Sequence, residues 1–132
     1  MSSSDRDRFF VYFRSGAATL AKAQETLPLH DLEATSSTEN TFTVEAEGLS
    51  FQVSLEESEQ VAAEASQAAG AEQQWQPLKE CSARFLVQIS DLQEALEEIN
   101  TMLELQEALQ DSCDGYLVLP WNGGILGPWG VN

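Results

Sequence analysis

Few side chains in this sequence could carry acid–base or nucleophilic chemistry. The single histidine, His30, stands beside Asp31 in a Ser/Thr-rich stretch. Nothing nearby supplies the nucleophile or substrate pocket that a general base requires, so we interpret His30 as a solvated loop residue. The sequence also lacks a phosphate-binding glycine loop, a G-x-S-x-G turn and an H-E-x-x-H motif. We therefore expect a protein that is not an enzyme and that has no cofactor.

Carboxylates are abundant, and their spacing raises the question of a metal site. Five glutamates of the segment 90–113 stand three or four residues apart in groups that would share a helix face: Glu94, Glu97, Glu98, Glu104 and Glu107. A di-metal bundle site would add a histidine three residues after a glutamate, and none follows here. Asp111 and Asp114 lack the oxygen spacing of an EF-hand loop. The pattern favours a solvated acidic face, and we expect no metal.

The cysteines and tryptophans suggest packing more than chemistry. Cys81 and Cys113 have no C-x-x-C spacing, which excludes a cysteine-built zinc site and favours two free, mostly buried thiols over a disulfide. The tryptophans stand in linkers or at strand ends, where we expect them to cover the sheet: Trp75, Trp121 and Trp129. Trp121 is the one that we select as a possible exposed anchor for a partner.

The elements that must position these residues follow from hydrophobic periodicity. Apolar, β-branched and alternating runs predict strands at 8–14, 41–47, 49–55, 84–89 and 116–121, with a short arm at 124–126. Helical spacing predicts helices at about 15–27, 54–69 and 90–113. Ser54 with Glu57, and Ser90 with Gln93, form possible capping boxes at the start of the second and third helices. The stretches 29–40 and 71–79 are expected to be a loop and a linker.

The segment 90–113 is the longest predicted helix and has two apolar faces. One stripe repeats at four, three and four residues, which predicts that it packs on the sheet: Leu92, Leu96, Ile99 and Leu103. Leu105 falls among the acids, and Met102, Leu109 and Cys113 lie on a flank. Either the helix bends near Glu104, or this second flank meets another part of the protein.

The order of elements predicts a single α+β domain spanning residues 1–132, with loose tails at 1–7 and 127–132. Its first six elements match a ferredoxin-like βαββαβ sandwich, to which a long helix and a C-terminal strand or hairpin are appended. A three-layer or differently wound α+β sheet is the alternative that element order leaves open.

Charge narrows the possible partners. The chain has 22 acidic and 6 basic residues, a formal net charge of −16, and no basic residue after Arg84. Such a surface repels nucleic acid and anionic lipid, and it attracts a cationic protein. The N-terminus lacks a hydrophobic signal region, and no apolar run is long enough to span a membrane. We expect a soluble, cytoplasmic monomer or homodimer that binds neither nucleic acid nor membranes.

In charge and size, the chain resembles the small acidic bacterial immunity proteins that neutralise basic toxin domains. This resemblance implies a direct inhibitor of a nuclease-like toxin. The expected contact surface combines acids with apolar anchors: Glu94, Glu97, Glu98, Glu104, Leu105, Glu107 and Trp121. The alternatives are a phage-type nucleic-acid mimic, a homodimeric structural module paired through Met102, Leu105 and Leu109, and a small-ligand or metal-binding protein. Acidity can also reflect a saline or acid-adapted host.

Overall fold

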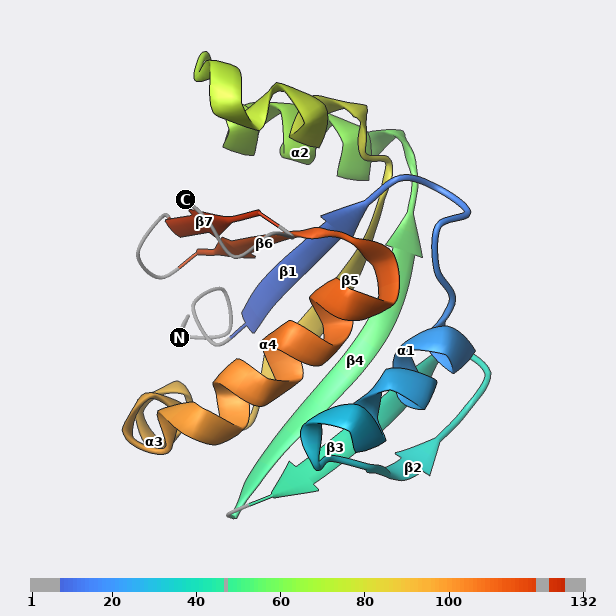
Figure 1. The fold of residues 1–132 in the computed structure, drawn as a ribbon, viewed down its shortest axis with the longest axis vertical. Coiled ribbons are helices and arrows are strands. Elements are labelled where there is room, and N and C mark those ends of the chain that lie inside the picture. Colours follow the sequence, from blue (N-terminus) through green and yellow to red (C-terminus); the bar gives the residue numbers. More distant parts are fainter. Residues whose placement is uncertain (1–7, 47, 121–123, 128–132) are drawn as a thin grey trace.

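The computed structural model describes residues 8–46, 48–120 and 124–127. In these residues the chain forms a seven-stranded antiparallel sheet with helical segments, which confirms the α+β class (Figure 1). The strands are β1 (Arg8–Phe13), β2 (Ala34–Ser37), β3 (Thr41–Ala46), β4 (Leu49–Glu57), β5 (Ala83–Ile89), β6 (Tyr116–Leu119) and β7 (Gly124–Leu126). The α-helices are α1 (Leu20–Thr26), α2 (Glu59–Ala69), α3 (Leu92–Glu97) and α4 (Ile99–Cys113), and the 3₁₀ helices are η2 (Leu27–His30) and η3 (Gln73–Glu80).

The strand order is β2-β3-β4-β5-β1-β6-β7, and every neighbouring pair is antiparallel. The ferredoxin-like topology is not confirmed, because that sandwich requires β1 beside β4, whereas β5 lies between them here. Element order does not specify which strands pair. In this chain, α2 and η3 connect β4 to its neighbour β5. Helices α3 and α4 then connect β5 to β6, which lies on the other side of β1. Strands β5 and β6 therefore flank β1 in a split βαβ unit.

The two faces of β1 are both covered, as its uninterrupted apolar run predicts. Phe9, Val11 and Phe13 belong to the larger core, which α1 and α4 cover from one side of the sheet (Figure 1). Phe10 and Tyr12 belong to a smaller core on the opposite face. That second core contains buried residues of α2 and η3: Val61, Ala65, Ala69, Trp75 and Leu78.

The predicted tryptophan cover is confirmed for Trp75. Its side chain is buried, and its ring meets Tyr116 edge-on with a centroid separation of 6.2 Å. Trp121 and Trp129 lie outside the described residues, as do the predicted turn at 122–123 and the tails at 1–7 and 128–132. The predicted C-terminal arm is present, because β7 pairs with β6 from Gly124 to Leu126.

Two helix starts differ from the capping boxes in the sequence. Strand β4 continues its pairing with β5 as far as Glu57, so Ser54 lies within a strand and Ser58 caps α2 instead. The Ser58 side chain accepts a hydrogen bond from the backbone N–H of Val61 at 3.2 Å. At α3 the cap is Asp91 rather than Ser90, because Ser90 Oγ already accepts from the backbone of β4.

The predicted helix over 90–113 is interrupted at Glu98, which separates α3 from α4. After this break the second apolar flank, not the predicted stripe, faces the sheet. The buried residues of α4 include Met102, Leu105, Ala108 and Leu109, whereas Leu96, Ile99 and Leu103 are exposed. The expectation that this stripe packs on the sheet is therefore wrong for Leu96, Ile99 and Leu103, whereas Leu92, its first member, is partly buried against the larger core. Helices α1 and η2 also contact α4.

The stretches expected to be irregular contain short elements. Residues 34–37 form the edge strand β2, paired with β3, and 3₁₀ helices occupy parts of both predicted loops. Both cysteines are free and buried, as predicted. None of the helices in the described ranges has the length and apolar character that crossing a membrane would need.

Candidate functional site

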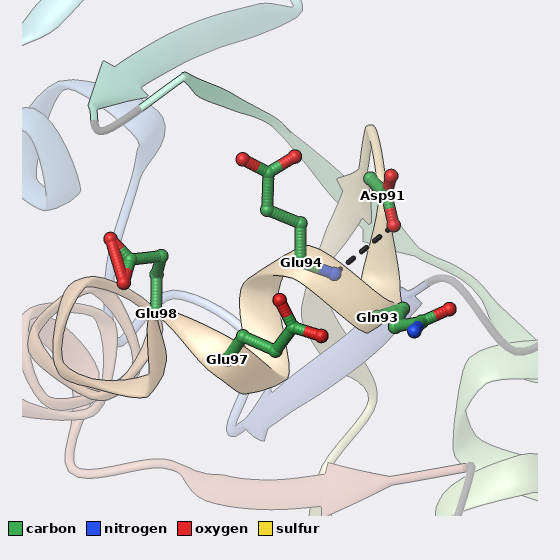
Figure 2. Close-up of a pocket in the computed structure, with 5 residues that line it drawn as sticks. All are labelled: Asp91, Gln93, Glu94, Glu97 and Glu98. Carbon is green, nitrogen blue, oxygen red and sulfur yellow. Dashed lines mark hydrogen bonds between the residues drawn. The ribbon is translucent and has the colours of Figure 1, made fainter.

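The acidic residues of α3 and of its two caps line one open hollow. Asp91 starts the helix by accepting a hydrogen bond from the backbone N–H of Glu94 at 3.1 Å. The helix then presents carboxylates on successive turns, and the hollow of about 380 Å³ is lined by Asp91, Gln93, Glu94, Glu97 and Glu98 (Figure 2). In the described part of the chain, no ion pair joins these carboxylates to a basic side chain.

An exposed apolar patch lies beside these acids. Leu96, Ile99 and Leu103 keep 44%, 36% and 41% of their surface exposed. Ile99 lines a second hollow, of about 210 Å³, together with Glu97 and Glu98. We call the combined set the α3–α4 surface, and it comprises Glu94, Leu96, Glu97, Glu98, Ile99, Leu103 and Glu107. Leu103 and Glu107 are neighbours on one face of α4 because they stand four residues apart.

Leu105 does not belong to this surface. Its side chain is fully buried in the larger core, so it cannot serve as the apolar anchor that the sequence suggested. Met102 and Leu109 are also buried, which contradicts a dimer paired through these three residues. The physical reason is the same for all three: α4 turns this flank toward the sheet. Trp121, the other predicted anchor, lies outside the described residues.

Glu104 and Glu107 belong to a second cluster, which surrounds His30. The imidazole Nδ1 lies 3.2 Å from Oε1 of Glu104 and 3.9 Å from Oε1 of Glu107, and Nε2 lies 2.8 Å from Oδ2 of Asp111. The His30 side chain is only 14% exposed. The interpretation of His30 as a solvated loop residue is therefore wrong, because η2 carries the ring onto α4.

A polar contact between α1 and α4 lies one turn before this ring. Oγ1 of Thr26, the last residue of α1, lies 2.7 Å from the carbonyl oxygen of Ala23 in the same helix and 3.0 Å from that of Ala108 in α4, so its one proton is shared between two acceptors. Burial disfavours the charged imidazole, but hydrogen bonds to Asp111 and Glu104 outweigh this effect and raise the pKa of His30. The spacing of the acids was visible in the sequence, but the histidine that joins them lies 74 residues from Glu104.

A third polar cluster serves packing. Arg84 is buried on the face of the smaller core, with Nε 2.6 Å from Glu56 and NH1 2.9 Å from the Tyr12 hydroxyl, and it also bonds to Glu64. Its guanidinium lies 4.3 Å from the centroid of the Phe10 ring. Burial opposes the charge, but the bonds to Glu64 and Glu56 raise the pKa of Arg84. Because its donors already meet these acceptors, this arginine is poorly suited to bind an external anion.

The two thiols are equally unsuited to nucleophilic chemistry. Cys81 and Cys113 line a hollow of about 320 Å³ at the end of β1. Burial raises the pKa of Cys81 to about 11 and that of Cys113 to about 12. Both thiols therefore stay protonated at neutral pH, whereas a reactive cysteine needs its thiolate.

The described residues form an α+β protein with an acidic, partly apolar exposed surface on α3 and α4. Comparison of the chain with protein families, curated proteins and solved structures found no match.

Proposed function

We propose that the chain is a small acidic binding protein that inhibits a basic protein partner, in the manner of an immunity protein on a nuclease-like toxin domain. The α3–α4 surface is the proposed contact. The observation that carries this proposal is the exposed apolar patch of Leu96, Ile99 and Leu103. It lies beside Glu94, Glu97 and Glu98, which form no ion pair among the described residues.

Each part of that surface has a separate physical role. Carboxylates on a rigid helix accelerate encounter with a cationic surface, and this acceleration weakens as salt screens the field. Apolar side chains that become desolvated at the centre of a contact slow dissociation instead. The absence of basic residues after Arg84 means that nothing in α3 or α4 would repel a cationic partner.

The proposal is tested on the product of the neighbouring reading frame, produced as a purified protein. Stopped-flow association is measured at several salt concentrations for the wild type and for Glu97→Gln/Glu98→Gln. We expect the double variant to associate more slowly and with a flatter salt dependence. Leu103→Ala should leave association almost unchanged and raise the dissociation rate.

Glu39→Gln/Glu45→Gln is the matched control, because it removes the same charge from exposed positions on the β2–β3 side of the sheet. If this control slows association as much as the α3 variant does, the surface is not specific and the proposal fails. A neighbouring product that is not basic, or that does not bind, would also contradict it.

The exposed leucines favour a second candidate, a homodimer through the same surface. Two copies would bring their acids face to face, so this dimer should form mainly at high salt. Sedimentation velocity at low and high salt, run on the wild type and on Leu103→Asp, separates the two functions. A dimer that Leu103→Asp abolishes would favour self-association over inhibition.

A further inference from the structure

The imidazole of His30 meets a carboxylate at each of its two nitrogens. Nε2 is 2.8 Å from Oδ2 of Asp111, and Nδ1 is 3.2 Å from Oε1 of Glu104. A neutral imidazole has one N–H, so it can donate to only one of these oxygens. When Nε2 donates to Asp111, the lone pair on Nδ1 faces a carboxylate oxygen. Either a proton on Nδ1 or a metal ion placed between Nδ1 and Glu104 makes that contact attractive.

Glu107, the third side chain of the cluster, lies at a distance that suits a metal ion better than a shared proton. Oε1 of Glu107 lies 3.9 Å from the same Nδ1. One ligand atom each from His30, Glu104 and Glu107 lies within 4.8 Å of the others. Metal–ligand bonds of about 2.0–2.2 Å place neighbouring ligand atoms roughly 3–4 Å apart, so small side-chain movements would close this set around one ion.

We propose that His30, Glu104 and Glu107 bind a first-row divalent transition metal ion such as Zn²⁺, with Asp111 orienting the imidazole from its far side. Imidazole nitrogen together with carboxylate oxygen suits Zn²⁺ and its neighbours, whereas Mg²⁺ and Ca²⁺ prefer oxygen ligands alone. A carboxylate that accepts the other N–H of a ligating histidine is the usual outer support of such a site.

The local charge is consistent with this assignment. Three carboxylates surround one imidazole, and in the described ranges no lysine or arginine forms an ion pair with them. A dication would offset the excess negative charge. The Glu104 and Glu107 side chains are 49% and 64% exposed, so the ion would enter from the solvent and keep its outer coordination positions open to water.

The test uses the full chain without an affinity tag. Because the sequence has one histidine, the imidazole resonances in a ¹H–¹⁵N NMR spectrum report on this site alone. We expect Zn²⁺ to shift the Nδ1 resonance and to leave Nε2 as an N–H bonded to Asp111. The same concentration of Mg²⁺ should not shift it. Ring signals that stay unchanged at saturating Zn²⁺, or that respond equally to Mg²⁺, would overturn the proposal.

Affinities from calorimetry complete the test. Glu107→Gln and His30→Ala should each weaken Zn²⁺ binding at least about tenfold, and Asp111→Ala should weaken it by about 10–100-fold. Glu107→Gln is the variant least expected to disturb folding, because the Glu107 side chain is mostly exposed. Glu97→Gln/Glu98→Gln is the matched control and should bind Zn²⁺ as the wild type does. Equal losses in the control and in Glu107→Gln would mean diffuse binding to acids and would refute the site.

Discussion

Glu64 and Glu97 carry the same carboxylate in different surroundings. Glu64 lies 2.5 Å from NH1 of the buried Arg84, whereas Glu97 lines an open hollow and has no basic partner among the described residues. A buried guanidinium is costly unless acceptors surround it. The carboxylate of Glu64 is one of these acceptors, so it stabilises Arg84 within the smaller core. Glu97 pairs with no basic side chain among the described residues, so its carboxylate is available to a partner.

This difference predicts an acid-dependent loss of stability that belongs to Glu64. The hydrogen bond from Arg84 outweighs burial and lowers the pKa of Glu64 in the folded chain. A depressed folded pKa contributes stability above the ordinary pKa of about 4.3, and that contribution is lost as pH falls through the folded value. We expect the wild type to exceed Glu64→Gln in free energy of unfolding near neutral pH, and the difference to shrink below about pH 4.

Urea unfolding at a series of pH values measures this difference. Glu59→Gln is the control, because Glu59 is an exposed acid of the same helix without an ion pair to Arg84. A gap between the wild type and Glu64→Gln that stays constant from neutral to acidic pH would show that the carboxylate charge contributes nothing.

At the scale of elements, α4 provides a matched pair of leucines. Leu105 is fully buried and Leu103 is 41% exposed, although they stand only two positions apart in the sequence. Leu105→Ala should lower the free energy of unfolding by roughly 2–5 kcal/mol, because it leaves a cavity in the larger core. Leu103→Ala should cost less than about 1 kcal/mol, since little buried surface is lost and alanine favours the helix. Urea unfolding followed by circular dichroism compares them, and equal costs would contradict this orientation of α4.

The same helix shows where sequence reasoning succeeds and fails. Runs of β-branched and aromatic residues located β1, β3, β4 and β5 almost to the residue, because strand signals are local. The apolar stripe of 90–113 was placed on the wrong face, because two stripes satisfy the helical period and only the approach of α1 and η2 decides between them. The break at Glu98 leaves no Gly or Pro signal in the sequence.

The candidate sites divide in the same way. The acids in and beside α3 were selected from their spacing alone. The structure shows that they line one hollow, and their role in binding stays a prediction. The contact of His30 with Glu104 and Asp111 could not be predicted, because it depends on a tertiary contact between segments more than 70 residues apart. Leu105 was selected because it stands among acids in sequence. Its burial was decided by the rotation of α4.

At the scale of the whole molecule, the net charge of −16 has consequences for stability as well as for recognition. A surface with one predominant sign repels itself in the compact state, and unfolding relieves this repulsion. The same field that would speed encounter with the proposed cationic partner therefore destabilises the unbound chain. A basic partner would remove the repulsion on binding, which couples association to stability.

This self-repulsion predicts that salt stabilises the protein. Raising NaCl from about 0.01 to 0.1 M shortens the Debye length from about 30 to 10 Å, which screens most repulsion between exposed acids on different elements. We expect the melting temperature, measured by circular dichroism, to rise over this range.

In Glu25→Lys/Glu33→Lys/Glu39→Lys, the charges of three exposed acids are reversed, and the rise in melting temperature should be smaller. Because these side chains form no ion pair within the described residues, the variant changes the field without removing a specific contact. A melting temperature that falls with salt in the wild type would mean that attractive pairs, such as those of Arg84 and His30, outweigh the acidic excess.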